Sequence, residues 1–202
     1  MNTEILNYIN YKNGFFIEAG ANDGVDQSYT HCLDSLGWKG ILIEPNKIKL
    51  EEAKTNRPNF IYENCALVSA SYDKETVYGD FAHTDRAGSL TAMIMDYGHF
   101  VDDELIEQKN NRKHLAIEVP AKTLTKILQK HNIQKIDLLV LDVEGYELSV
   151  LNGLDFEICQ PKYMLLEVFV NTQREKTIID FLESKHYKNL GLIGANRLFE
   201  KV

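Results

Sequence analysis

The residues best suited to ligand chemistry follow a short apolar run near the start of the chain. The run Phe-Phe-Ile at 15–17 leads into Glu18 and then into Gly-Ala-Asn-Asp-Gly at 20–24. Glycine takes positive φ at little cost and lets the backbone lie close to a ligand, so Gly20 and Gly24 predict a tight loop where a strand ends. We expect free N–H groups at the start of the next helix to face the ligand.

A second acidic residue lies where a ribose-binding acid is expected. The apolar run at 41–43 ends in Glu44, about 20 residues after the glycine turn. In dinucleotide-type folds, an acid at this position accepts hydrogen bonds from the ribose hydroxyls. The two segments together therefore indicate a nucleoside site.

The acid before the turn restricts the charge of that nucleoside. Glu18 would repel a pyrophosphate but would attract an ammonium or sulfonium cation. The turn also differs from Gly-x-Gly-x-x-Gly, and it lacks the Gly-Lys-Ser/Thr ending of a P-loop. A positively charged nucleoside fits these features, and we predict S-adenosylmethionine as the cofactor.

These residues need strands that end at one edge of a sheet. Apolar runs predict strands over 14–18, 40–44, 60–63, 136–142 and 163–168. Helical patterns alternate with them over 28–36, 47–56, 124–131, 145–151 and 173–185. The unbroken apolar run at 138–141 is typical of a strand buried on both faces of a parallel sheet. The chain therefore predicts an α/β fold with a doubly wound, mostly parallel sheet.

Two regions depart from the alternation of strand and helix. Segments 187–193 and 197–202 flank Gly-Ala-Asn, which predicts a C-terminal antiparallel hairpin. Long insertions often form a lid or a substrate platform, and the stretch at about 69–119, with a predicted hairpin around 77–81, has this character. The alternative is that it only covers a sheet edge. We predict a single domain over 1–202 that contains this inserted lid or acceptor region.

Composition excludes several classes of partner. The 202 residues are 44% hydrophobic, enough for one core, and 22 basic against 30 acidic residues give a net charge of −8. Nucleic-acid binders usually carry a basic face, so we predict no nucleic-acid partner. The three cysteines are too scattered for a zinc site or a disulfide framework, and we predict no bound metal. The N-terminus lacks a signal peptide and no apolar run is long enough to cross a membrane, which predicts a cytoplasmic protein without a membrane partner.

Four segments together resemble the FkbM family of S-adenosylmethionine-dependent methyltransferases. They are residues 17–24, 43–46, 65–67 and 136–147, and the most specific part is Asp-Val-Glu-Gly-Tyr-Glu at 142–147. The resemblance covers nearly the whole chain. It implies the Rossmann-like class I methyltransferase fold and O-methylation of a carbohydrate or another small-molecule hydroxyl.

The resemblance also implies roles for individual residues in cofactor binding. Glu18 would hold the methionine ammonium, directly or through water, and Glu44 would accept hydrogen bonds from both ribose hydroxyls. Other residues would shape the loop, read the adenine edge or reach the methionine carboxylate: Gly20, Asn22 and Gly24 for the loop, Asn64 and Ala66 for adenine, and Ser28 for the carboxylate. The alternative for Ser28 is a helix N-cap without ligand contact.

Methyl transfer to a hydroxyl also needs a group that removes the proton. A placed base typically contributes 10²–10⁴-fold. Asp142, at a strand end beside the expected methyl group, is the first candidate for base or acceptor orienter, and we also count it among the cofactor-binding residues. Glu144 is the second, although acids are also favoured at a helix start, and His83 in the inserted region is the third. Asp142 and Glu144 with a loop histidine are an alternative Mg²⁺ site, but no dense ligand cluster supports it.

Two other readings compete with methyl transfer. An NAD-dependent oxidoreductase would carry a third glycine in the loop and no acid before it, so Glu18 argues against it. A non-catalytic nucleoside-binding module would be expected to lose the acids at the strand ends, and these are present.

Overall fold

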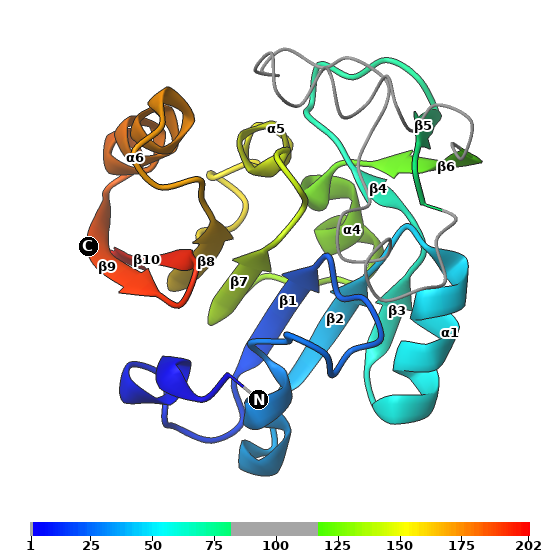
Figure 1. The fold of residues 1–202 in the computed structure, drawn as a ribbon, viewed down its shortest axis with the longest axis horizontal. Coiled ribbons are helices and arrows are strands. Elements are labelled where there is room, and N and C mark those ends of the chain that lie inside the picture. The colour runs from blue at the N-terminus through cyan, green and yellow to red at the C-terminus, as the bar shows by residue number, and fades with distance from the viewer. Residues whose placement is uncertain (1, 82–116) are drawn as a thin grey trace.

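A seven-stranded sheet runs through the centre of the computed structural model, which describes residues 2–81 and 117–202 (Figure 1). Its order is β3-β2-β1-β7-β8-β10-β9. The strands are β1 (Phe15–Ala19), β2 (Lys39–Ile43), β3 (Ile61–Glu63), β7 (Leu138–Leu141), β8 (Tyr163–Glu167), β9 (Tyr187–Ile193) and β10 (Asn196–Lys201). The first five pair in parallel, and β10 runs antiparallel to both β8 and β9. The predicted mostly parallel sheet with a C-terminal antiparallel hairpin is confirmed.

Helices cover both faces of this sheet. They are α1 (Lys47–Asn56), α4 (Leu124–Lys130), α5 (Glu147–Leu151), α6 (Gln173–Ser184) and two 3₁₀ helices, η1 (Glu4–Asn7) and η2 (His31–Leu36). Side chains alternate along a strand. Ile17 of β1 belongs to a core cluster that includes residues of α4, α5 and α6, whereas Phe16 belongs to the cluster with residues of η1 and η2 on the other face. The sheet is therefore doubly wound, as predicted. Within the described ranges, no helix is long and apolar enough to cross a membrane.

The helix predicted over 28–36 is wrong in type and extent. Only the 3₁₀ helix η2 forms there, and the segment 20–30 between β1 and η2 is irregular; we call it the cofactor loop. Gly24 and Gln27 have φ values of 79° and 60°, outside the helical region. The Asp23 carboxylate accepts hydrogen bonds from the N–H groups of the second and third residues after it, a local turn that competes with helix formation.

The expectation of free N–H groups in this loop is also wrong. The N–H groups of Gly20 and Ala21 both donate to the Ile43 carbonyl at 3.1 Å, and the Asn22 N–H donates to the Glu44 carboxylate. The start of the loop is therefore hydrogen-bonded to the end of β2. These three backbone donors bind the protein itself and not a ligand.

A second, smaller sheet lies beside the main one, with the order β4-β6-β5. It contains β4 (Ala66–Leu67), β5 (Thr76–Gly79) and β6 (Ile117–Lys122). The hairpin predicted around 77–81 is wrong in its partner, because β5 pairs antiparallel with β6, which is distant in sequence (Figure 1). The remainder of the predicted inserted region, 82–116, lies outside the described residues, so its role as a lid stays a prediction.

A buried carboxylate joins the two sheets. Glu63, at the end of β3, is 2% exposed and accepts hydrogen bonds from Lys122 at 2.7 Å, and from Lys130 and His131 at 2.5 Å. Burial alone would raise the pKa of Glu63, but these hydrogen bonds outweigh burial and lower its pKa from 4.5 to about 2. The cluster ties the edge of the main sheet to β6 and α4.

The Glu63 cluster predicts a specific acid sensitivity. A carboxyl group whose pKa is lowered on folding stabilises the fold above its unfolded pKa of 4.5 and loses this contribution as the pH falls toward 2. We expect Glu63→Gln to lower the urea midpoint at pH 7 and to weaken the fall in midpoint between pH 5 and pH 2.5. The exposed Glu51, paired with Lys54 on α1, provides the control, and Glu51→Gln should change little. If the urea midpoints of the native protein and of Glu63→Gln fall in parallel with pH, Glu63 is not the source of this acid sensitivity.

Candidate functional site

A pocket opens at the carboxyl ends of the parallel strands, where β1 lies between β2 and β7. The strand order reverses at this point, and open α/β sheets bind their ligands there. The sequence-predicted site residues that line the pocket are Glu18, Gly20, Asn22, Ser28, Glu44, Ala66, Asp142 and Glu144. The fold thus gathers these residues from four separate segments of the chain into one cavity.

Among the described residues, two sequence-predicted ones do not line the pocket, Gly24 and Asn64. Gly24 faces the end of α1, and an added Cβ would lie 3.2 Å from Arg57 Cδ. The Asn64 side-chain amide donates to the carbonyls of Glu44 and Pro45 at 2.8 and 2.9 Å, so it holds the backbone that follows β2. His83 lies outside the described residues, and its catalytic role stays a prediction.

Gly20 allows the closest backbone approach in the site. Its φ is 81°, and an added Cβ would lie only 1.7 Å from the carbonyl oxygen of Asp142. Hence the turn after β1 and the end of β7 contact each other directly. Only glycine satisfies both the left-handed φ and this contact.

Glu44 lies at the base of the pocket, where its side chain is buried. Its two carboxylate oxygens accept hydrogen bonds from the N–H groups of Asn22 and Asn46, at 2.9 and 2.8 Å. Burial raises the pKa of Glu44 from 4.5 to about 7, against the opposing effects of these two hydrogen bonds and of Lys49. Each oxygen has a second lone pair, so the carboxylate can still accept from two ligand hydroxyls.

Asn22 carries an unsatisfied acceptor into the same pocket. The residue is 9% exposed, and its Oδ1 is buried without a hydrogen-bond partner in the described part of the chain. Its φ of 47° shows that the backbone adopts a costly conformation to present this side chain. A buried acceptor without a partner costs free energy, so the site is suited to a ligand with an N–H or O–H donor.

Glu18 is also a pocket residue, but donors of the protein surround its carboxylate. Ser28 Oγ lies 2.9–3.0 Å from both oxygens, Thr30 Oγ1 donates at 2.6 Å and the Tyr29 N–H at 3.1 Å. The Ser28 oxygen in turn accepts from the backbone of Thr30 and His31. Glu18 and Ser28 therefore organise the end of the cofactor loop from within the pocket wall.

A second group of acids lines the opposite wall. One carboxylate oxygen from each of Asp142, Glu144 and Glu167 lies within 4.8 Å of the others. Burial raises the pKa of Asp142 well above its ordinary value, and the nearby charges, Glu167 first, raise it further. The pKa of Glu167 is raised as well, mainly by burial, and the nearby charge of Glu147 raises it further. This pair is a proton-binding group inside the pocket.

An ion pair holds the segment that carries these acids. Glu147, 0% exposed, is ion-paired with Arg174 of α6 and accepts from the N–H groups of Val143 and Gly145 at 3.2 and 3.3 Å. The sequence reading missed Glu147 and Arg174 as supports of the site, and it also missed Glu167. Glu167 had a usable signal, because it is an acid next to the last residue of the strand predicted over 163–168.

The Gly20 contact generates a test that isolates steric collision. Gly20→Ala should destabilise the protein by about 4 kcal/mol or more, since backbone strain and overpacking add. Gly191 is the matched control because its φ is 106° but no atom lies within 4 Å of an added Cβ. Gly191→Ala should cost about 1–2 kcal/mol from strain alone. Urea unfolding of both variants measures the difference, and equal losses would refute the predicted collision.

Comparison with known proteins identifies the family. A profile described as "Methyltransferase FkbM domain" matches residues 18–189. Among solved structures, the chain is similar to a TehB-like SAM-dependent methyltransferase from Corynebacterium glutamicum, with 11% identity and a TM-score of 0.45, over 98% of this chain and 85% of that chain. No curated protein matches the chain significantly. Because the domain match spans most of the chain, this protein belongs to the FkbM family of S-adenosylmethionine-dependent class I methyltransferases.

Proposed function

We propose that this methyltransferase transfers the methyl group to a hydroxyl oxygen of a carbohydrate or another small acceptor. The observation that supports the proposal is a pocket rich in acceptor oxygens, with Glu44, Asn22 and the pair Asp142–Glu167 around one cavity. Such a lining suits a ligand that carries hydroxyl donors and positive charge. The family argues against the alternative of an NAD-dependent oxidoreductase.

Residues of the pocket wall that is formed by β1, the cofactor loop and the end of β2 are proposed to hold the cofactor. Glu44 accepts from both ribose hydroxyls with its remaining lone pairs, and Asn22 Oδ1 accepts a further donor. Ala66 borders the side expected for adenine, and Gly20 leaves room beside the methionine part. Glu18 contributes negative charge near the ammonium; its oxygens already accept from Ser28, Tyr29 N–H and Thr30, so we favour contact through water.

Residues of the opposite wall are proposed to handle the acceptor proton. S-adenosylmethionine, when bound, supplies an electrophilic methyl group. Asp142 then accepts the proton of the acceptor hydroxyl, because a carboxylate with a raised pKa is a stronger base than an ordinary one. A positive charge nearby favours the ionised carboxylate, so Asp142 gives up its own proton more readily in the loaded pocket. Glu144 is the second candidate for this role.

The buried Glu44 predicts pH-dependent cofactor binding. Its pKa is about 7, so it is ionised and accepts from both hydroxyls above pH 7 but is protonated below it. We expect calorimetry to show S-adenosylmethionine affinity falling as the pH decreases from 8 to 6. Glu44→Gln should bind about 10–100-fold more weakly at pH 8, because charged hydrogen bonds are lost, and should lack this pH dependence.

The exposed Glu51 on α1 provides the control for that titration, because its partner Lys54 is not among the groups that shift the pKa of Glu44, and Glu51→Gln should behave as the native protein does. Binding of NAD in place of S-adenosylmethionine, or binding of neither, would overturn the proposed cofactor site. An unchanged affinity in Glu44→Gln would remove Glu44 from it.

A methyl-transfer screen tests the acceptor and the base together. Labelled S-adenosylmethionine is incubated with a panel of sugars and alcohols, and the methylated atom is identified by NMR. Asp142→Asn should lower turnover by about 10²–10⁴-fold while S-adenosylmethionine affinity changes less than tenfold. Native turnover should rise with pH, because the base must lose its proton. Loss of turnover in Glu144→Gln alone would assign the base to Glu144, and methylation at nitrogen would refute the proposed chemistry.

A further inference from the structure

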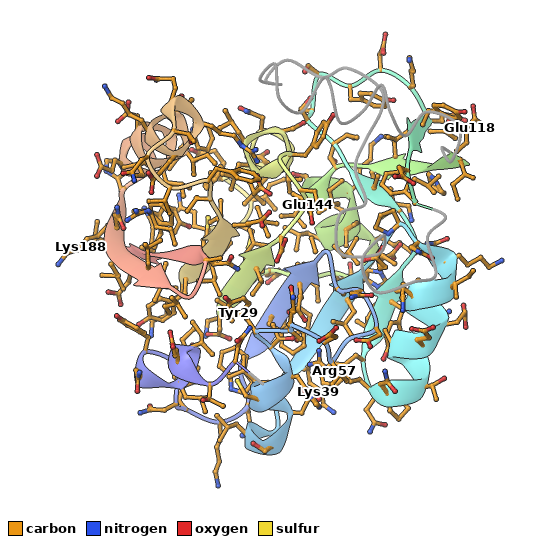
Figure 2. The ribbon with its side chains drawn as sticks, viewed as in Figure 1. Tyr29, Lys39, Arg57, Glu118, Glu144 and Lys188 are labelled. Atoms are coloured by element: carbon orange, nitrogen blue, oxygen red, sulfur yellow. The ribbon has the colours of Figure 1, made fainter. Side chains whose placement is uncertain are left out.

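Arg57 is a buried arginine outside the pocket, at the C-terminal end of α1 (Figure 2). Its side chain is 1% exposed. The guanidinium lies 4.5 Å from the ring centre of Phe60 and 5.2 Å from that of Phe16. Tyr62 donates to its backbone carbonyl, so β3 fixes the main chain from which it extends. A buried charge of this kind requires partners, because an unpaired one is costly.

All three guanidinium nitrogens have partners, and these partners surround the cofactor loop. Nε and Nη2 donate to the two carboxylate oxygens of Asp34 in η2, at 3.0 and 2.6 Å. Nη1 lies 3.4 Å from Glu18 Oε2 and also donates to the Gly24 carbonyl at 3.2 Å and to Thr30 Oγ1 at 3.0 Å. One side chain thus contacts the strand end before the loop, a turn within the loop, and the 3₁₀ helix after it.

The loop needs such support because its backbone conformation is unfavourable. Asn22 and Gln27 have positive φ, and the segment has no regular secondary structure. Residues of this kind persist only where their surroundings hold them in place. Six of the loop residues line the pocket: Gly20, Asn22, Asp26, Gln27, Ser28 and Tyr29. A shift of the loop would therefore displace one whole wall of the site.

We infer that Arg57 is a positioning residue for the cofactor pocket, which it controls through Glu18, Gly24 and Thr30 without touching the ligand. This inference rests on the proposed function of the pocket. The positive charge of Arg57 is also needed beside Glu18, since Glu18 would otherwise be a buried carboxylate with no cation among the described residues around it. Removal of Arg57 therefore both loosens the loop and leaves a buried negative charge.

The experiment compares the buried Arg57–Glu18 pair with a second, partly buried arginine–glutamate pair of the native chain. Arg197 of β10 pairs with Glu175 of α6, is 15% exposed and does not line the pocket. Arg57→Met and Arg197→Met should both lower the urea midpoint. Only Arg57→Met should weaken S-adenosylmethionine binding, by tenfold or more, as measured by calorimetry without urea at a temperature at which both variants are folded. It alone should also raise the amide hydrogen exchange of residues 20–30. Arg57→Lys keeps the positive charge but loses the planar group with several N–H donors. Its S-adenosylmethionine affinity and its amide exchange over residues 20–30 should lie between those of the native protein and of Arg57→Met.

The outcomes separate this inference from the proposed function. The positioning role would be overturned if Arg57→Met binds S-adenosylmethionine with an affinity within twofold of the native value and its amide hydrogen exchange over residues 20–30 is unchanged. This holds even if the variant is less stable. If Arg57→Met does not fold, Arg57→Lys and Asp34→Asn decide the question by the same two measurements. If the native protein does not bind S-adenosylmethionine, the proposed cofactor site fails, and loop exchange alone then supports or refutes the role of Arg57.

Discussion

Burial of carboxylates at one edge of the sheet is the constraint on which this structure depends. A parallel sheet ends its strands at a common edge, and here β1, β2, β7 and β8 each have an acid within one residue of their last residue. A buried carboxylate must be hydrogen-bonded, ion-paired or protonated. The protein provides for all three: backbone donors at Glu44, Arg57 at Glu18, and a raised pKa that favours the protonated form at Asp142.

These solutions give the two walls of the pocket different chemistry. On the wall of β1 and β2, Glu18 is paired and Glu44 is held by two backbone N–H groups, so this wall is fixed in place. On the wall of β7 and β8, burial and neighbouring acids raise the pKa of both Asp142 and Glu167, which favours proton binding there. A fixed wall is suited to binding, and a wall that exchanges a proton is suited to the acceptor chemistry that an O-methyltransferase needs.

Both walls depend on arginines that stand behind them. Arg57 holds the cofactor loop through Glu18, and Arg174 holds the segment after β7 through Glu147. In each case the arginine lies in a helix or at its C-cap, and the acid paired with it accepts hydrogen bonds from N–H groups of an irregular segment. An irregular segment has no helical or strand hydrogen bonds of its own, so a planar donor with several N–H groups can replace them. The rigid layers of the fold thereby fix the segments that form the site.

The sequence by itself determined the sheet, its C-terminal hairpin, the family, and the strand-end acids, because strand periodicity and glycine turns are local signals. It also predicted Gly20, Asn22, Glu44 and Asp142 as pocket residues, since strand ends meet at one edge in a parallel sheet. Only the tertiary structure decided that no α-helix follows the glycine turn, that β5 pairs with β6, and that Arg57 supports the loop. These features arise from contacts between residues distant in sequence, where packing overrides local preference and no short pattern marks the partner.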